Sequence, residues 1–414
     1  MDNTVSMRKN VLWNTAGSVF YCACQWLITV LVVRFESFET SGYLSLAMTT
    51  SSSFSAISLF SMRHFQVSDV NEEYSSKEYY GSRLITCFIA QIACMLYATV
   101  ACRTSYNFWC ITLFMLVRVA EALVDVFHGI NQKFNRYDLI GKSYILRGLF
   151  TIISFTIGLL LTHNLMVTLF IMALSNLFVA FLFDRVNTGR LENIRPILFD
   201  RHVYKLIFTC IPLVVFTFLL SMENLIPKNL LEGLFGADEL GIYASIASPT
   251  LVVQVMASVI FNPFLPQFTK LYTEGRYDVF QKMFHKILYA LAGMSIAIII
   301  GANLVGRLGL KILFGEMILK YYYLFNPIVW CTILTAMIWI VSSIVIAIRQ
   351  IKMLLLGIVF DFILCMILSR PLVEQYNKNG VSVVQIISYA ILILYMIIIC
   401  ETTVNREKKA KHKE

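Results

Sequence analysis

Long apolar runs alternate with short polar segments along the whole chain. A membrane-spanning helix needs about 20 apolar residues, because the hydrocarbon core of a bilayer is about 30 Å thick. Twelve runs of this kind can be read from the sequence: 11–33, 42–60, 84–101, 108–127, 145–161, 165–183, 206–221, 240–260, 287–304, 324–348, 353–368 and 381–400. The pattern predicts an all-α polytopic membrane protein with about 12 transmembrane helices, and the runs are too long for the strands of a membrane β-barrel.

The placement of the few charged residues supports this count. Only 14% of the 414 residues are charged, whereas a soluble domain carries about 25%. With the N-terminus inside the cell, 25 of the 34 Lys and Arg residues fall in cytoplasmic segments, 8 fall on the opposite side, and Arg118 lies within a run. Because basic residues accumulate on the cytoplasmic side, we expect both termini in the cytoplasm. The net charge of +9 then reflects topology, and no nucleic-acid partner is expected.

The twelve runs divide equally at the polar segment 184–205. We therefore expect two domains, an N-terminal six-helix bundle at 1–190 and a C-terminal six-helix bundle at 191–414. Two equal halves with a substrate route between them are a frequent plan of transporters. The connections are too short for a soluble domain and contain no Walker-type glycine-rich loop, so we expect no ATP hydrolysis, no enzyme activity and no bound cofactor. We also expect no metal site, because Cys22-x-Cys24 lacks a partner His or Cys at a metal spacing.

Four charged residues lie clearly inside the apolar runs: Arg118, Glu121, Asp125 and Asp361. A charged residue in a transmembrane helix is costly and by default faces an interior cavity. The first three are spaced i, i+3, i+7, which places them on one stripe of a helix. They predict either the wall of a polar translocation cavity or an internal salt bridge, because Arg118 can pair with Glu121 one turn on. For Asp361, a structural hydrogen bond and a proton or substrate role stay open.

Two further groups of polar residues are candidates for contact with a substrate. Eight hydroxyl residues lie between positions 49 and 61; they favour either close helix packing or a hydrated wall, to which Ser52 and Ser55 would belong. Basic residues at the ends of runs, among them Arg34, Arg147 and Lys228, are typical of headgroup contacts. Alternatively they hold an anionic substrate, since the guanidinium group makes bidentate bonds with phosphate.

Several short motifs resemble those of a known family. They are Arg63-x-x-Gln66-x-x-Asp69, Glu121-x-x-x-Asp125-x-x-x-Gly129-x-x-Gln132 and, in the second half, Glu239-Leu-Gly-Ile-Tyr243. Together with twelve runs they are similar to polysaccharide-biosynthesis flippases, the Wzx-type exporters of the multidrug/oligosaccharidyl-lipid/polysaccharide superfamily.

The resemblance implies a fold of two six-helix bundles around a central cavity that opens alternately to either side of the cell (inner, cytoplasmic) membrane. It implies a substrate, an undecaprenyl-diphosphate-linked oligosaccharide of the O-antigen (lipopolysaccharide), capsule or exopolysaccharide type, moved from the cytoplasmic to the outer leaflet. Arg118 and Arg147 are the best matches to the basic cavity residues of the family, and Arg34, Lys228 and Arg370 are weaker matches. Membrane lipids, a glycan polymerase and other assembly proteins are the expected partners.

Energy for such transport would come from H+ or Na+ exchange at Glu121, Asp125 or Asp361, since no ATPase motif is present. One alternative is a cation-coupled drug antiporter of the MATE type in the same superfamily. Another is a membrane-embedded glycan polymerase or ligase, although such enzymes usually carry a long external loop.

Overall fold

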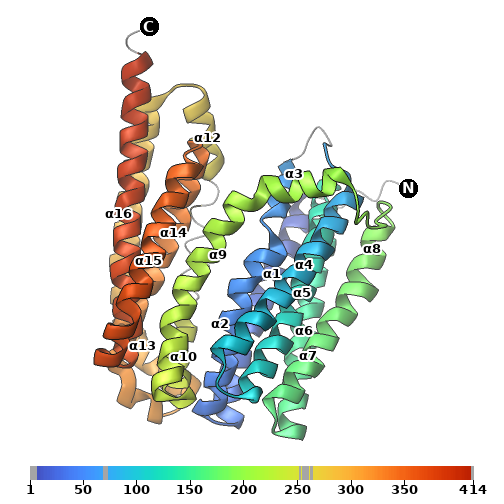
Figure 1. The fold of residues 1–414 in the computed structure, drawn as a ribbon, viewed down its shortest axis with the longest axis vertical. Coiled ribbons are helices and arrows are strands. Elements are labelled where there is room, and N and C mark those ends of the chain that lie inside the picture. Colours follow the sequence, from blue (N-terminus) through green and yellow to red (C-terminus); the bar gives the residue numbers. More distant parts are fainter. Residues whose placement is uncertain (1–6, 69–72, 251–252, 254–260, 262–263, 412–414) are drawn as a thin grey trace. The chain divides into compact units, whose positions relative to one another are not determined.

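The computed structural model describes residues 7–68, 73–250, 253, 261 and 264–411. These residues form helices joined by short connections, and no β-strand occurs among them (Figure 1). The all-α prediction is therefore confirmed for this part of the chain. The chain divides into two compact units, Met1–Leu225 and Ile226–Glu414, within helix α9 (Arg201–Phe235). The boundary expected at 190–191 lies in the connection that precedes α9.

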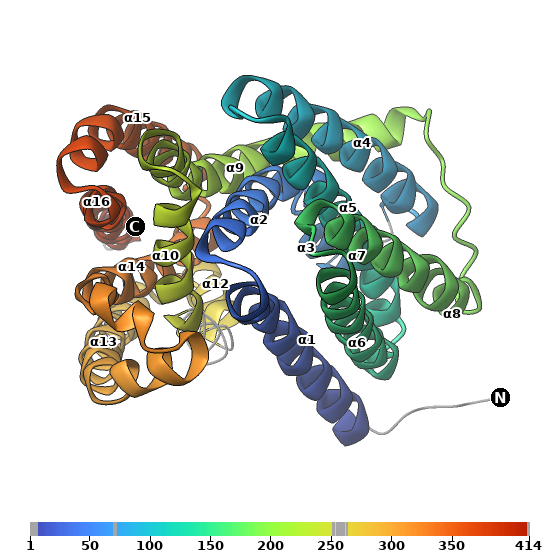
Figure 2. The ribbon, with the colours of Figure 1, turned by 90° about the horizontal axis from the view of Figure 1, so that it is seen from below.

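The first unit consists of helices that surround a central one. In chain order they are α1 (Met7–Phe35), α2 (Phe38–Leu59), α3 (Met62–Ser68), α4 (Ser76–Ala101), α5 (Ser105–Lys133), α6 (Tyr137–Thr162), α7 (Leu165–Val179), the π-helix η1 (Ala180–Asp184), α8 (Arg185–Gly189) and the first part of α9. Helix α5 packs against α2, α3, α4, α6 and α7, as the view along the helices shows (Figure 2). A residue on α5 can therefore meet side chains from most of the unit.

A tight turn and two close approaches position the helices around α5. Phe60 and Ser61 both have positive φ (50° and 51°), and they end α2 so that α3 turns back against α5. A side chain at Gly129 would not fit, because its Cβ would lie 2.1 Å from Oε1 of Gln66 on α3. Helices α1 and α6 also approach closely, since a Cβ on Gly141 would lie 2.1 Å from a backbone oxygen of α1.

The second unit is built around its C-terminal helix. Its elements are the second part of α9, α10 (Ala237–Ala247), the 3-10 helices η2 (Ser248–Thr250) and η4 (Met317–Leu324), α12 (Leu265–Thr273), α13 (Tyr277–Phe314), α14 (Phe325–Ala347), α15 (Ile351–Tyr376) and α16 (Lys378–Lys411). Helix α16 packs against α13, α14 and α15. Lys378 at its start forms an ion pair with Glu239 of α10 and lies 4.8 Å from the ring centre of Tyr321.

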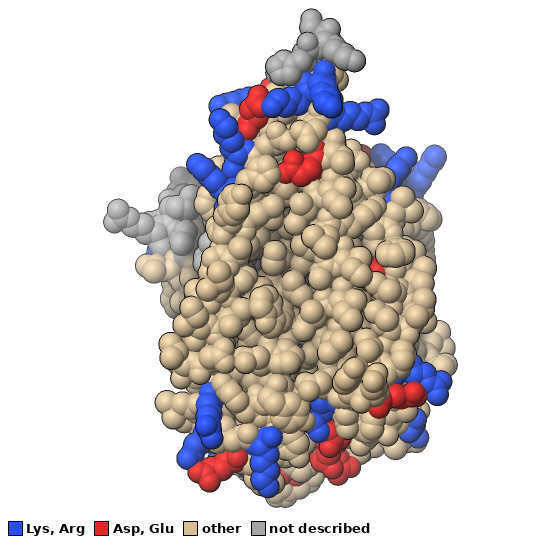
Figure 3. Space-filling model, turned by 90° about the vertical axis from the view of Figure 1, so that its left-hand side faces the viewer, with Lys and Arg blue, Asp and Glu red and all other residues tan. Residues whose placement is uncertain are grey.

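Nine helices of the described chain are long and apolar enough to cross a membrane, and each coincides with one of the predicted runs. Helices α2 and α5, with 22 and 29 residues, match two further runs but are more polar. The eighth run, 240–260, lies partly outside the described residues, so the count of twelve stays a prediction, as do the cytoplasmic termini. The face in Figure 3 has a wide band almost free of charged side chains, with Lys, Arg, Asp and Glu gathered at its two ends.

Candidate functional site

The charged stripe of α5 lies inside the first unit, where five other helices supply partners for it. Arg118 donates from Nη1 to Glu121 Oε2 at 2.7 Å and from Nη2 to Ser52 Oγ at 2.9 Å. The ion pair that the i, i+3 spacing predicted is therefore confirmed. On the other side of the carboxylate, Arg147 of α6 lies 3.5 Å from Glu121 Oε1.

Tyr21 of α1 completes this group, which we call the central cluster (Tyr21, Ser52, Arg118, Glu121 and Arg147). Its hydroxyl donates to Glu121 Oε1 and accepts from Arg147 Nη2 at 2.9 Å. The Arg147 guanidinium also lies 4.7 Å from the centre of the Tyr21 ring, a cation–π contact. The Glu121 carboxylate thus joins two arginines and a phenol, and Arg118 links them to the Ser52 hydroxyl, so the cluster combines residues of α1, α2, α5 and α6.

A second group, the α3 cluster (Arg63, Arg83, Asp125 and Gln132), lies one to three turns further along α5. Arg63 Nη1 lies 3.1 Å from Asp125 Oδ1, and Arg83 Nη2 lies 2.9 Å from Oδ2. Arg63 also donates to Gln132 Oε1 at 3.3 Å. Asp125 and Glu121, which would repel each other at i, i+4, are therefore each neutralised by two arginines.

The two sequence motifs of the first half, one on α3 and one on α5, contact each other where these helices pack together. Gln66 of α3 donates to the carbonyl of Val126 at 3.1 Å and occupies the space left by Gly129. That contact holds α3 against α5, so that Arg63 reaches Asp125 and Gln132. The motif residue Asp69 lies outside the described residues.

Arginines outnumber carboxylates in these two clusters by four to two. The inner arginines are shielded, with Arg83 fully buried and the Arg147 side chain 3% exposed. The outer ones are more accessible, because the side chains of Arg118 and Arg63 are 19% and 29% exposed. Burial lowers the pKa of the Arg63 guanidinium, but the Asp125 carboxylate and Tyr144 together outweigh burial, and the pKa lies above its ordinary value. These two clusters therefore carry an excess of permanent positive charge, which attracts anions.

The hydroxyl residues of α2 mostly serve packing. Thr50, Ser51, Ser53 and Ser58 are buried, and several donate to backbone oxygens within α2. Ser52 reaches the central cluster through Arg118, whereas Ser55 donates to the Ser52 carbonyl at 2.7 Å. Among the hydroxyl residues with described contacts, only Ser52 therefore touches a charged group of the central cluster.

The remaining predicted site residues lie elsewhere. Arg34 is exposed in the last turn of α1, about 20 Å along that helix from Tyr21. Lys228 is half-buried on the part of α9 that belongs to the second unit. Asp361 of α15 is 1% exposed and, with Gly357 and Tyr395, lines a cavity of about 240 Å³ between α15 and α16. The structure brings Arg118, Glu121, Arg147 and Ser52 together, with Asp125 in the neighbouring α3 cluster.

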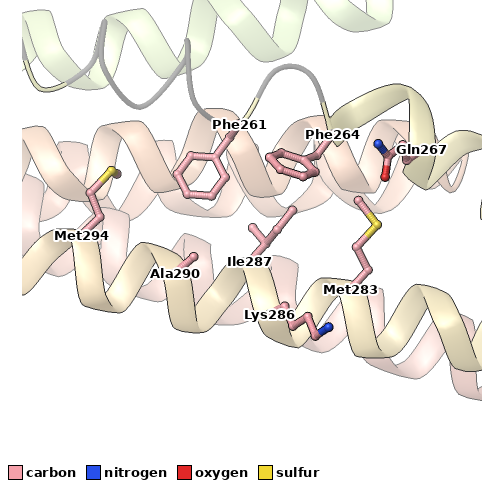
Figure 4. Close-up of a pocket in the computed structure, with 8 residues that line it drawn as sticks. All are labelled: Phe261, Phe264, Gln267, Met283, Lys286, Ile287, Ala290 and Met294. Atoms are coloured by element: carbon pink, nitrogen blue, oxygen red, sulfur yellow. The ribbon is translucent and has the colours of Figure 1, made fainter.

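A larger cavity, of about 460 Å³, lies in the second unit between the start of α12 and helix α13 (Figure 4). Phe261 and Phe264 point toward Ile287 and Ala290 across it, and the lining is almost entirely apolar. Lys286 is the one charged residue among the described residues that line it. Such a lining suits hydrocarbon rather than a charged headgroup, so the polar candidate site is the central cluster.

Sequence reasoning missed Tyr21 as a site residue, and the predicted runs 42–60 and 84–101 left Arg63 and Arg83 in the connection between them. The run of apolar residues at 84–101 begins after Arg83, whereas helix α4 already begins at Ser76, with Ser75 and Glu78 forming a capping box. The motif that contains Arg63 and Gln66 was the one signal that could have pointed to α3. Nothing in the sequence pattern pointed to Tyr21, because a tyrosine in an apolar run is ordinary.

Comparisons with known proteins agree with the predicted resemblance. No family model matches the chain. The chain is 27% identical to the capsular polysaccharide biosynthesis protein CapF of Staphylococcus aureus over 314 aligned residues. The aligned region covers 75% of this chain and 78% of CapF. The fold of the chain is similar to lipid II flippase MurJ in an inward closed conformation (TM-score 0.68, 12% identity, 96% of this chain and 90% of MurJ).

The fold is also similar to an inward-facing multidrug resistance MATE transporter of the MOP superfamily (TM-score 0.64, 12% identity, 99% of this chain and 97% of that one). The predicted resemblance is therefore confirmed as a sequence similarity to a capsular polysaccharide biosynthesis protein and a fold similarity to a lipid II flippase and a transporter of this superfamily. At 12% identity the two solved structures show the fold alone. Together with the nine apolar helices, they identify a multi-pass membrane protein with a transporter fold.

Proposed function

We propose that this chain, with the fold of MOP-superfamily transporters, is a flippase for lipid-linked oligosaccharides. Its substrate would be an undecaprenyl-diphosphate-linked repeat unit of a capsule, O-antigen or exopolysaccharide, moved from the cytoplasmic to the outer leaflet of the cell membrane. The similarity to a capsular polysaccharide biosynthesis protein supports a glycan as the transported group. The similarity to a lipid II flippase supports a lipid-linked form of that glycan as the substrate.

The observation that carries the proposal is the excess of arginine over carboxylate in the central and α3 clusters. A diphosphate diester carries two negative charges, which lose their hydration when they enter a bilayer. Fixed guanidinium groups replace that hydration, and their planar forks match the geometry of phosphate oxygens. A cation transporter would need the opposite arrangement, with carboxylates left available for the cation.

Within the central cluster the two arginines take different roles. Arg118 is the accessible one, and its contact with the neutral Ser52 hydroxyl can be exchanged for a phosphate oxygen at little cost. Arg147 is shielded and is bound by both Tyr21 and Glu121, so we regard it as a positioning residue. Glu121 holds both guanidinium groups in place and limits the positive charge, which prevents the anion from binding too tightly to leave.

Alternating access would move the headgroup, while the polyprenyl tail stays in lipid. Similar folds of multidrug resistance MATE transporters occur in an inward-facing and in an outward-facing conformation, which supports this mechanism for the fold. Transport would be coupled to H+ or Na+. A glycan polymerase would remove the product on the outer side.

The test in cells is deletion of the gene, followed by complementation. We expect lipid-linked repeat units to accumulate on the inner leaflet of the deletion strain. Wild type and Arg118→Lys should restore export, the latter in part, whereas Arg118→Ala should not. Full export by Arg118→Ala, at equal protein abundance, would contradict the role of the cluster.

A MATE-type drug antiporter is the second candidate, because the similarity to a MATE transporter covers 99% of this chain. Glu121 and Asp125 would then bind a cation. Their ion pairs with arginine argue against it. Unchanged glycan export in the deletion strain, together with altered drug tolerance, would favour this candidate.

A further inference from the structure

The stripe of α5 continues beyond Asp125 to a buried histidine that the central and α3 clusters do not use. His128 lies ten residues after Arg118, on the same face of the helix. Its Nε2 lies 3.6 Å from Oδ1 of Asp184, the last residue of the π-helix η1. The two side chains are 2% and 1% exposed.

This pair differs from the other ionisable groups of the first unit in what surrounds it. Glu121 and Asp125 are each held by two arginines. Neither carboxylate oxygen of Asp184 accepts a hydrogen bond from any residue that the structure describes, and His128 Nε2 also lacks one. The separation of 3.6 Å is too long for a hydrogen bond. A buried carboxylate beside a titratable imidazole, with unfilled bonding capacity on both, is suited to bind a proton.

The backbone at Asp184 supports a movable element. The five residues of η1 form a π-helix between α7 and α8, and π-helices are rare and frequently occur at functional sites. Asn131 of α5 accepts a hydrogen bond from Thr188 of α8 at 3.2 Å, so α8 is also tied to α5 near this point. A stronger His128–Asp184 bond would draw η1 toward α5.

Aromatic rings connect the pair to the central cluster. The ring of His128 packs edge-on against Tyr144 with 5.0 Å between ring centres. The ring centre of Tyr144 lies 5.6 Å from that of Tyr21, and the Tyr21 hydroxyl donates to Glu121. Along the axis of α5, His128 and Glu121 are about 10 Å apart.

We propose that His128 and Asp184 form a proton-binding site whose charge state sets how strongly the central cluster binds an anion. This inference rests on the proposed flippase function and locates its proton coupling. The proton adds to the unprotonated nitrogen of the neutral imidazole, no other bond breaks, and the resulting imidazolium donates to the Asp184 carboxylate. The charge of the interior rises by one, and anion binding strengthens.

The other charged groups near His128 are not suited to act as the proton-binding group in its place. Arg63 of α3 and Arg147 of α6 are the cations whose charge reaches His128, and both are already bonded to carboxylates. Arg83 of α4 is bound to Asp125, Arg185 of α8 is exposed, and α7 contains no charged residue. Among these groups, His128 is the one whose ordinary titration range includes physiological pH.

The test uses the purified full-length protein in lipid nanodiscs and a farnesyl-diphosphate-linked N-acetylglucosamine as probe. The charge of this diphosphate diester does not change between pH 5 and 8. We expect the wild type to bind the probe on the order of tenfold more tightly at pH 5.5 than at pH 8, as one added charge about 10 Å away predicts. His128→Gln and Asp184→Asn should bind with little pH dependence, and His163→Gln, which removes an exposed histidine, should behave like the wild type.

A second measurement needs no ligand. NMR of ¹⁵N-histidine-labelled protein, with His128→Gln for assignment, should show His128 changing its protonation state between about pH 4.5 and 8. A His128 signal that does not titrate, or equal pH dependence in wild type and His128→Gln, would overturn the proton site. If no variant binds the probe at any pH, the proposed function fails, and the NMR titration alone decides whether the pair binds a proton.

Discussion

Glu121 offers the sharpest perturbation of the candidate site, because it should change stability and anion affinity in opposite directions. The substitution Glu121→Gln keeps the size of the side chain and much of its hydrogen bonding, but it removes the negative charge between Arg118 and Arg147. Breaking a buried ion pair costs about 3–5 kcal/mol. Since this pair is 19% exposed and an amide oxygen can still accept from one arginine, we expect a loss of about 2 kcal/mol in the free energy of unfolding.

The gain in affinity follows from Coulomb's law. An anion on the outer edge of Arg118 would lie about 6 Å from the Glu121 carboxylate, which repels it by about 3 kcal/mol per unit charge at an effective dielectric constant of 20. Partial exposure of the cluster reduces this repulsion. We therefore expect a gain of about 1.4 kcal/mol in binding free energy, which lowers the Kd roughly tenfold. Tighter binding should slow release, so turnover in a flipping assay should fall.

The assays are thermal unfolding and titration with the farnesyl-diphosphate-linked probe, both in nanodiscs at pH 8. Glu316→Gln is the matched control, because Glu316 forms its ion pair with Lys311 at an exposed position. It should change neither quantity measurably. Weaker binding by a folded Glu121→Gln would refute the assignment of the central cluster as an anion site.

Three further predictions follow from individual contacts. Ser52→Ala should strengthen probe binding by up to about threefold, because it removes a contact of Arg118 that a phosphate oxygen would replace, whereas Ser55→Ala should leave the Kd unchanged. Asp125→Asn should lower the unfolding free energy by about 3 kcal/mol, since it leaves the fully buried Arg83 without a carboxylate, and unaltered thermal stability would count against that ion pair. Gly141→Ala should destabilise the protein by more than about 2 kcal/mol, because the new Cβ would collide with the backbone of α1. Gly301 of α13 has open space around it, so Gly301→Ala should be neutral or stabilising by up to about 1 kcal/mol.

The sequence predicted those features that depend on local spacing. The nine apolar helices followed from run length, and the Arg118–Glu121 pair followed from residues three apart on one helix. Arg147 was a candidate as a basic residue at the end of a run, and the family resemblance ranked it with Arg118. Two predicted runs that were short, at 206–221 and 353–368, belong to helices of 35 and 26 residues, because the ends of these helices are polar and add nothing to an apolar run.

Contacts between distant helices could not be predicted in this way. Asp125 is bound by residues 62 and 42 positions away, from a short helix and from the polar start of α4. Hydropathy places both arginines in a loop, whereas the turn at Phe60 and the space at Gly129 direct them inward. The His128–Asp184 pair depends in the same way on the π-helix, which has no sequence signature.

The most direct test of the central claim is a flipping assay with the purified protein in liposomes. A fluorescent polyprenyl-diphosphate-linked oligosaccharide is placed in the membrane, and an impermeant quencher reports the fraction that has changed leaflet. The wild type should flip the substrate and respond to a proton gradient; Arg118→Ala should flip it at least about tenfold more slowly, and Arg118→Lys at an intermediate rate. Equal flipping rates for wild type and Arg118→Ala would contradict the account. So would a folded wild-type preparation that flips the substrate no faster than empty liposomes.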